Sequence, residues 1–224
     1  MIELRNVWKA FGSGRKRHVV VGGASLVLPR GRKIALLGAP GMGKSTLLRI
    51  LAGLEEPDQG VVRATGLRCW PFNYGSFMEK NATILQNGLL FEHLFKVDGK
   101  EVAAIAAELS GVRVGPAKPF RKYTTLEKRG LMLGFSLAVQ FDWYFVDDNL
   151  PPPPPDQGPM IDSVIADRFE RASVIWATSD SSFLEGYCDA GLVLHRGKLT
   201  FYDTLAEASE AYVAAAQNEG SKRK

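Results

Sequence analysis

The sequence predicts an α/β fold that carries a small helical lobe. Short apolar runs, typical of buried strands, alternate with segments whose apolar residues recur about every 3.6 positions, as in helices. A glycine-rich loop lies between one of these strands and the helix after it. A stretch rich in helical patterns, roughly residues 82–139, interrupts the alternation. Alternating strands and helices build a mostly parallel sheet, so this stretch is expected to form the lobe.

The predicted elements follow the chain in a simple order, with three strands before the first helix. Apolar runs predict strands at Ile2–Val7, Val19–Leu28, Lys33–Leu37, Phe141–Val146, Ser173–Ala177, Gly191–His195 and Lys198–Tyr202. Helical periodicity predicts helices at Lys44–Ala52, Ala82–Leu94, Glu101–Leu109, Thr125–Val139, Met160–Arg171 and Thr204–Ala215. A hairpin turn is expected at Arg196-Gly197, between the last two strands.

Length and composition fit one domain over residues 1–224. Apolar residues make up 46% of the 224 residues and charged residues 23%, which argues against disorder. The 28 Lys and Arg exceed the 24 Asp and Glu by four, giving a net charge of +4. This mild excess suits anionic ligands such as nucleotides, and no nucleic-acid partner is expected. The basic tail, residues 218–224, is expected to be solvated, with contact to anionic lipid as the alternative.

No segment is predicted to cross a membrane. The charged N-terminus lacks the apolar core of a signal peptide. The longest apolar stretch, 131–141, is interrupted by polar residues and falls short of the ~20 residues that span a bilayer. The two cysteines show neither metal-binding nor disulfide spacing, so a reducing cytosolic setting is expected.

A phosphate-binding loop follows the strand Lys33–Leu37. Its sequence matches the pattern G-x-x-x-x-G-K-S between a strand and a helix, where glycines let backbone N–H groups converge on phosphates. Lys44 is expected to reach the β- and γ-phosphates of ATP or GTP, and the Ser45 hydroxyl to ligate Mg²⁺. The predicted nucleotide-binding residues of this loop are Gly38, Ala39, Pro40, Gly41, Met42, Gly43, Lys44, Ser45 and Thr46.

An acidic pair ends the later apolar strand Phe141–Val146. A carboxylate at the end of a buried strand beside a phosphate loop is well placed to hold the Mg²⁺ hydration shell. Asp147 is therefore the predicted metal-side carboxylate. Asp148 is the candidate for orienting or deprotonating the attacking water. An acidic turn without a role in catalysis is the alternative.

With these motifs the chain resembles the ATP-binding subunits of ABC transporters over nearly its whole length. It is most similar to those of bacterial capsular-polysaccharide exporters, including the polysialic acid type. The segments that carry the resemblance are Ile2–Phe11, Leu51–Gly60, Cys69–Pro71, Phe135–Asp142, Tyr187–Leu194 and Gly197–Tyr212. The resemblance implies a P-loop NTPase core of the ABC ATPase type, with an antiparallel β subdomain and a small helical lobe. It also implies that Phe11 stacks on adenine.

The resemblance further implies cofactors, partners and a location. ATP and Mg²⁺ are expected to bind, and a separate integral-membrane permease is the expected partner. The subunit is expected to form a homodimer, or a heterodimer with another ATP-binding subunit. It would lie in the cytoplasm, peripheral on the inner face of the bacterial inner membrane.

The sequence departs from the family pattern at positions that matter for hydrolysis. The signature-like residues are Thr124, Thr125, Leu126 and Glu127, where the family places small residues and a glycine that approach the γ-phosphate of the opposite subunit. Asp148 stands where the family has a glutamate, and Ser179 where it has the switch histidine. Met78 falls about where a glutamine is expected, and the proline run Pro151–Pro155 replaces the loop that contacts the partner subunit.

Three functions remain open from the sequence. One is a motor subunit that couples ATP hydrolysis to polysaccharide export. The second is a regulatory subunit that binds ATP, hydrolyses it poorly and pairs with a competent paralogue. The third is an unrelated P-loop enzyme such as a small-metabolite kinase. The proline run is expected to be a rigid surface loop, with a ligand for a proline-recognising module as the alternative.

Overall fold

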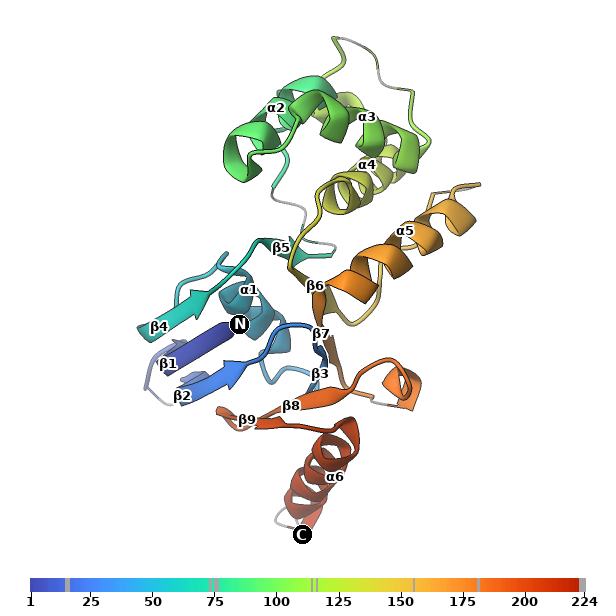
Figure 1. The fold of residues 1–224 in the computed structure, drawn as a ribbon. Coiled ribbons are helices and arrows are strands. Elements are labelled where there is room, and N and C mark those ends of the chain that lie inside the picture. Colours follow the sequence, from blue (N-terminus) through green and yellow to red (C-terminus); the bar gives the residue numbers. More distant parts are fainter. Residues whose placement is uncertain are drawn as a thin grey trace. The chain divides into compact units, whose positions relative to one another are not determined.

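The computed structural model describes residues 1–14, 17–72, 74, 77–113, 115, 117–154, 156–180 and 182–221. The chain forms two compact units. Unit 1 comprises residues 1–71, 142–148 and 172–224, and unit 2 comprises 72–141 and 149–171 (Figure 1). Pro155 of the proline run and residues 222–224 of the predicted basic tail lie outside the described residues.

Unit 1 contains the strands and two helices. Its strands are β1 (Ile2–Phe11), β2 (His18–Leu28), β3 (Lys33–Leu37), β4 (Gln59–Ala64), β5 (Arg68–Pro71), β6 (Trp143–Asp147), β7 (Ser173–Thr178), β8 (Ala190–His195) and β9 (Lys198–Tyr202). Its helices are α1 (Lys44–Ala52) and α6 (Leu205–Ser221), with a short 3₁₀ helix at Ser182–Leu184. Unit 2 contains α2 (Ile84–Phe95), α3 (Gly99–Ser110), α4 (Thr125–Ala138) and α5 (Gly158–Arg171), with a 3₁₀ helix at Phe120–Lys122.

Two sheets organise unit 1. A three-stranded antiparallel sheet has the order β2-β1-β4, and a six-stranded sheet has the order β5-β6-β7-β3-β8-β9. In the larger sheet only β9 is antiparallel to its neighbour. Asp147 of β6 is in register with Ala177 of β7, which is in register with Leu36 of β3. The carboxyl ends of these three strands therefore meet at one edge of the sheet.

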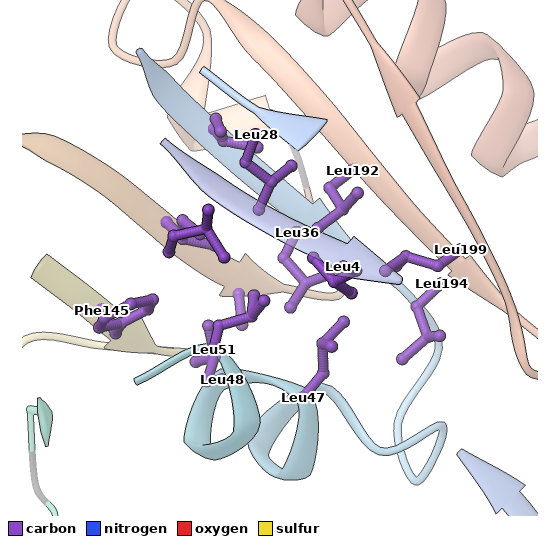
Figure 2. Close-up of a cluster of buried hydrophobic side chains, with 14 of the residues drawn as sticks. Leu4, Leu28, Leu36, Leu47, Leu48, Leu51, Phe145, Leu192, Leu194 and Leu199 are labelled. Atoms are coloured by element: carbon purple, nitrogen blue, oxygen red, sulfur yellow. The ribbon is translucent and has the colours of Figure 1, made fainter. Parts of the chain in front are cut away.

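The core of unit 1 lies on both faces of the larger sheet. On one face α1 and the smaller sheet contribute leucines that pack with the side chains of β3, β6 and β8 (Figure 2). The period-two alternation of a strand divides β3 between the faces. Ile34 and Leu36 join this first cluster, while Ala35 and Leu37 join a second one beneath α6. The strand that precedes the phosphate loop is thus held from both sides.

Helix packing in unit 2 depends on glycines at helix crossings. A β-carbon on Gly88 of α2 would lie 2.1 Å from the carbonyl oxygen of Gly99, where α3 begins. A β-carbon on Gly134 of α4 would lie 2.5 Å from the carbonyl oxygen of Ala106 in α3. At both crossings the backbones approach too closely for a side chain, which joins α2, α3 and α4 into one compact lobe.

The structure contains every strand and helix that the sequence predicts, with shifted ends, and adds β4 and β5. β4 is mostly exposed and begins with Gln59-Gly60, so it lacks the alternation of a half-buried strand. β1 runs to Phe11, beyond the predicted end at Val7. Asn6 has a φ of 50° and the pairing register with β2 shifts between Leu4 and Val7. This bulge interrupts the alternation on which the predicted end depends. Within the part of the chain that the structure describes, each helix is too short or too polar to span a bilayer.

Candidate nucleotide-binding site

The loop 38–43 is pressed against two neighbouring strands. A β-carbon on Gly43, whose φ is 96°, would lie 2.5 Å from Cγ1 of Val20 in β2. A β-carbon on Gly38 would lie 2.9 Å from the carbonyl oxygen of Leu194 in β8. Only glycine fits at these two positions, because the first needs a left-handed backbone and both need close approach.

Lys44 and the start of α1 make this loop attractive to an anion. Gly43 caps the helix without a side-chain hydrogen bond, so the amides of the first turn are not bound by a capping side chain. Lys44 is 9% exposed, and its ammonium donates to the carbonyl oxygen of Gly38 at 2.7 Å. Burial lowers the pKa of Lys44, while the carboxylates of Asp148 and Asp147 raise it. A buried cation at a helix N-terminus favours phosphate groups.

The two hydroxyl groups after Lys44 have different surroundings. Ser45 is exposed. Thr46 is buried, and its hydroxyl accepts a hydrogen bond from Nη2 of Arg49 at 3.0 Å. Ser45 is therefore the hydroxyl accessible to a metal ion. Oxygen donors such as this hydroxyl and the Asp147 carboxylate are the ligand types that Mg²⁺ prefers.

The acidic pair stands at the carboxyl end of β6. Asp147 is the last residue of that strand, and Asp148 is exposed with a left-handed φ of 61°. The Asp148 amide donates to the carbonyl oxygen of Ala177 at 3.0 Å. Its own carbonyl oxygen accepts from the Trp176 indole Nε1 at 2.9 Å. Both the amide and the carbonyl group of Asp148 are thus hydrogen-bonded to residues of β7.

Ser179 follows directly after β7, the strand that lies between β3 and β6. It is exposed, and its carbonyl oxygen accepts from the Tyr212 hydroxyl of α6 at 3.3 Å. The topology therefore brings Ser179, the phosphate loop and the acidic pair to the same sheet edge, as parallel strands do in nucleotide-binding α/β folds.

Phe11 lies at the end of β1 with 45% of its surface exposed. It pairs with His18, two residues before Val20, which contacts the loop at Gly43. Two strand residues span roughly 7 Å, so the pairing places the end of β1 on the side of β2 that approaches the loop. The Lys9 ammonium lies 5.4 Å from the ring centre. The exposed ring is available for stacking on a base.

The signature-like residues lie in unit 2, at the start of α4. Thr124 is the N-cap, and Thr125 is the first residue of the helix. The Thr124 hydroxyl accepts from the Glu127 amide at 3.2 Å, while the Glu127 carboxylate accepts from the Thr124 amide at 2.6 Å. Lys118 lies 3.6 Å from that carboxylate, and Leu126 is 58% exposed. The Glu127 carboxylate therefore places a negative charge at the N-terminus of its own helix, α4.

The proline run packs against its own unit. Pro154 is buried, and its Cγ lies 3.0 Å from the position that a β-carbon on Gly130 would take. Pro151 and Pro152 line a cavity of about 370 Å³ in the same unit. The described prolines of the run lie outside any helix or strand, and Pro152 and Pro153 are exposed. Met78 is also buried, at 5% exposure.

Sequence reasoning missed two side chains near the site, Trp176 and Tyr212. They donate hydrogen bonds to the carbonyl oxygens of Asp148 and Ser179. Trp176 belongs to no recognised motif, and Tyr212 ends a segment that carries the family resemblance without an assigned role. The apolar pattern of a strand or helix gives no sign of an indole or hydroxyl donor. Only the fold brings these donors to the acceptors.

Comparison with known proteins agrees with this fold and site. The sequence profile of the ABC transporter family matches residues 21–135, about half of the chain. The chain belongs to the ABC transporter family, and the matched residues include the phosphate loop 38–46. This membership excludes the small-metabolite kinase that the sequence left open.

Relatives of similar length are ATP-binding proteins, among them one for capsule polysaccharide export and one for polysialic acid transport. The chain is 29% identical to the capsule polysaccharide export ATP-binding protein CtrD of Neisseria meningitidis serogroup B, covering 95% of this chain and 98% of that protein. It is 28% identical to the ATP-binding protein BexA of Haemophilus influenzae with the same coverage. It is 26% identical to the polysialic acid transport ATP-binding protein KpsT of Escherichia coli, also with this coverage.

Solved structures support the fold. The structure of an ATP-binding subunit of an ABC transporter matches with a TM-score of 0.66 and 19% identity, covering 96% of this chain and 99% of that chain. The dimeric ATP-binding cassette MJ0796 bound to ADP and phosphate matches with a TM-score of 0.63 and 18% identity, covering 90% and 98%. At these identities the likeness establishes an ABC ATPase fold.

Proposed function

We propose that this chain is the ATP-binding subunit of an ABC transporter that exports capsular or related cell-surface polysaccharide. It couples binding and hydrolysis of ATP to export through a separate integral-membrane permease. It works as a dimer of ATP-binding subunits at the cytoplasmic face of the inner membrane. The observation that carries this proposal is the end-to-end similarity to a capsule polysaccharide export ATP-binding protein and to a polysialic acid transport ATP-binding protein, which extends over 95% of the chain.

Binding is assigned to residues 38–46 together with Phe11. Amides of the loop and of the first turn of α1 surround the phosphates, and the Lys44 ammonium neutralises the β- and γ-phosphates. Phe11 stacks on the adenine ring. Ser45 and Asp147 hold Mg²⁺, which supplies charge neutralisation at the transferred phosphoryl group.

Hydrolysis is assigned to the two groups at the neighbouring strand ends. The Asp148 carboxylate accepts a hydrogen bond from the attacking water, orients it toward the γ-phosphate and takes up its proton as the general base. The Ser179 hydroxyl donates a hydrogen bond to a γ-phosphate oxygen. A hydroxyl lacks the charge of an imidazolium, so it stabilises the growing negative charge less than the family histidine would.

The test is deletion of the coding sequence in its native bacterium, followed by measurement of surface polysaccharide. Loss of surface polysaccharide with accumulation inside the cell supports the proposal. Restoration by the parent chain but not by Lys44→Ala assigns export to the nucleotide site. Unchanged surface polysaccharide in the deletion strain contradicts a role in its export.

A second candidate is a regulatory subunit that binds ATP but hydrolyses it poorly and pairs with a competent paralogue. The capping of α4 by Glu127 favours it, because a carboxylate at that terminus opposes the approach of a phosphate. Turnover by the purified chain with its permease separates the two candidates. Turnover of ~1 s⁻¹ or more, within the usual enzymatic range, favours the motor. Turnover that requires a second ATP-binding subunit favours the regulatory subunit.

A further inference from the structure

Four aromatic side chains pack against one buried apolar cluster of unit 1. Trp176, Tyr187, Tyr202 and Tyr212 lie against the apolar cluster between α6 and the large sheet, and we call them the aromatic cluster. Trp176 and Tyr187 meet edge to face, with ring centres 5.5 Å apart and an interplanar angle of 79°. Their contact joins β7 to the segment that follows Ser179.

Trp176 fixes the backbone at the acidic position. Its indole nitrogen donates to the Asp148 carbonyl oxygen at 2.9 Å, an ordinary hydrogen-bond length. Asp148 has a φ of 61°, in the left-handed region that residues with a β-carbon rarely adopt. Such a backbone persists only when its surroundings hold it. Two hydrogen bonds hold the Asp148 backbone: its carbonyl oxygen accepts from the Trp176 indole, and its amide donates to the carbonyl oxygen of Ala177.

Tyr212 makes the equivalent contact at the switch position. Its hydroxyl donates to the Ser179 carbonyl oxygen at 3.3 Å, a longer bond than that of Trp176. Burial raises the pKa of Tyr212, which keeps the phenol protonated and able to donate. The aromatic cluster therefore contacts both of the residues assigned to hydrolysis, through one donor each.

We propose that Trp176 and Tyr212 are positioning residues that set the directions of the Asp148 and Ser179 side chains toward the γ-phosphate. This inference deepens the proposed function and rests on it. A shift of about 1 Å in a catalytic group can lower a rate up to about 100-fold, so loss of either donor acts on the chemical step. Binding on residues 38–46 does not involve these donors and stays intact.

Conservative variants separate positioning from packing. Trp176→Phe and Tyr212→Phe each keep an aromatic ring and remove the donor. Tyr202→Phe is the matched control, because it removes a hydroxyl from the same cluster that donates to neither carbonyl group. A packing role alone predicts that all three variants change thermal stability and leave the rate of bound ATP hydrolysis unchanged.

The experiment measures single-turnover hydrolysis of radiolabelled ATP over hours, together with the Kd for ATP–Mg²⁺ and the Tm. Trp176→Phe is expected to slow hydrolysis about tenfold and Tyr212→Phe several-fold, with Kd within twofold of the parent. Tyr202→Phe is expected to match the parent rate. An unchanged rate in Trp176→Phe, or an equal fall in Tyr202→Phe, overturns the inference.

A second readout does not depend on turnover. The indole N–H resonance of Trp176 can be assigned among the four tryptophans by its loss in Trp176→Phe. It is expected to shift when ATP–Mg²⁺ is added to the parent but not to Lys44→Ala. If the parent binds ATP and the Trp176 resonance does not shift at saturating nucleotide, the inference is overturned. A parent that binds no ATP contradicts the proposed function instead.

Discussion

Thr124 and Glu127 cap each other at the N-terminus of α4. Each side chain accepts a hydrogen bond from the other residue's amide, at 3.2 Å and 2.6 Å. The hydrogen bond from the Thr124 backbone amide is the largest cause of the lowered pKa of the Glu127 carboxyl group. The carboxylate therefore stays ionised at neutral pH and complements the positive end of the helix. A phosphate approaching this terminus meets a negative charge.

Neutralising that charge is expected to raise ATP turnover. Glu127→Gln keeps the capping geometry, because glutamine also serves at this position of a capping box. We expect turnover by the dimer to rise several-fold with ATP affinity unchanged. Glu127→Ala is the control, since it removes the charge together with the carboxylate's bond to the Thr124 amide, and it is expected to lower helix stability by about 0.3–1 kcal/mol. A steady-state ATPase assay gives the answer, and lower turnover in Glu127→Gln would contradict this account of α4.

The capping contribution also predicts a pH dependence of stability. The Glu127 pKa is lower in the folded chain than its ordinary value of 4.5, so the unfolded chain binds a proton first as the pH falls. The stabilisation is present above 4.5 and is lost as the pH falls through the lowered pKa. Urea titrations at several acidic pH values should show that Glu127→Gln loses less stability than the parent over this window. Equal losses of stability in the parent and in Glu127→Gln would show that the Glu127 carboxylate does not stabilise the helix.

At the acidic position, Asp148→Asn is expected to bind ATP normally and to abolish turnover. Asparagine tolerates the left-handed φ of 61° but cannot accept a proton from water. Asp148→Glu together with Ser179→His is expected to raise turnover without tightening ATP binding. Glutamate fits the left-handed backbone less well, so this pair should also lower the Tm. Turnover by Asp148→Asn equal to that of the parent would remove Asp148 from the chemistry.

Phe11→Ala is expected to weaken ATP binding and leave binding of inorganic triphosphate unchanged. Only the adenine contact is lost, and base stacking of this kind contributes ~1–3 kcal/mol, or roughly 5- to 150-fold in Kd. Isothermal titration with both ligands separates base from phosphate recognition. Equal losses for ATP and triphosphate would show that Phe11 does not contact the base.

Gly134→Ala is expected to destabilise unit 2 by about 1–3 kcal/mol, because its β-carbon would meet the backbone of Ala106 and force α3 and α4 apart. Gly158→Ala is the control at the start of α5, where the nearest atom, Cγ of Pro153, lies 3.9 Å away. It should be neutral or slightly stabilising. Urea unfolding followed by circular dichroism compares the two, and an equal midpoint would contradict the close helix crossing.

The sequence predicts much of this fold because its buried strands and the phosphate loop have strong local patterns. β5 escapes prediction because four residues ending in Pro71 are too short for a periodic signal. The phosphate loop is predicted by its sequence motif, and Asp147 by its position at the end of an apolar strand. The left-handed backbone of Asp148 and its hydrogen bond from Trp176 cannot be predicted in this way, because both depend on the pairing of β6 with β7.

The most direct test of the central claim is the Kd for ATP–Mg²⁺ of the parent chain and of Lys44→Ala, measured by titration calorimetry. Lys44 supplies the buried cation of the loop, so its removal should weaken binding on the order of 100-fold. Lys100→Ala, which removes an exposed lysine of α3, should leave Kd unchanged. Equal Kd values for the parent and Lys44→Ala would contradict ATP binding on this loop.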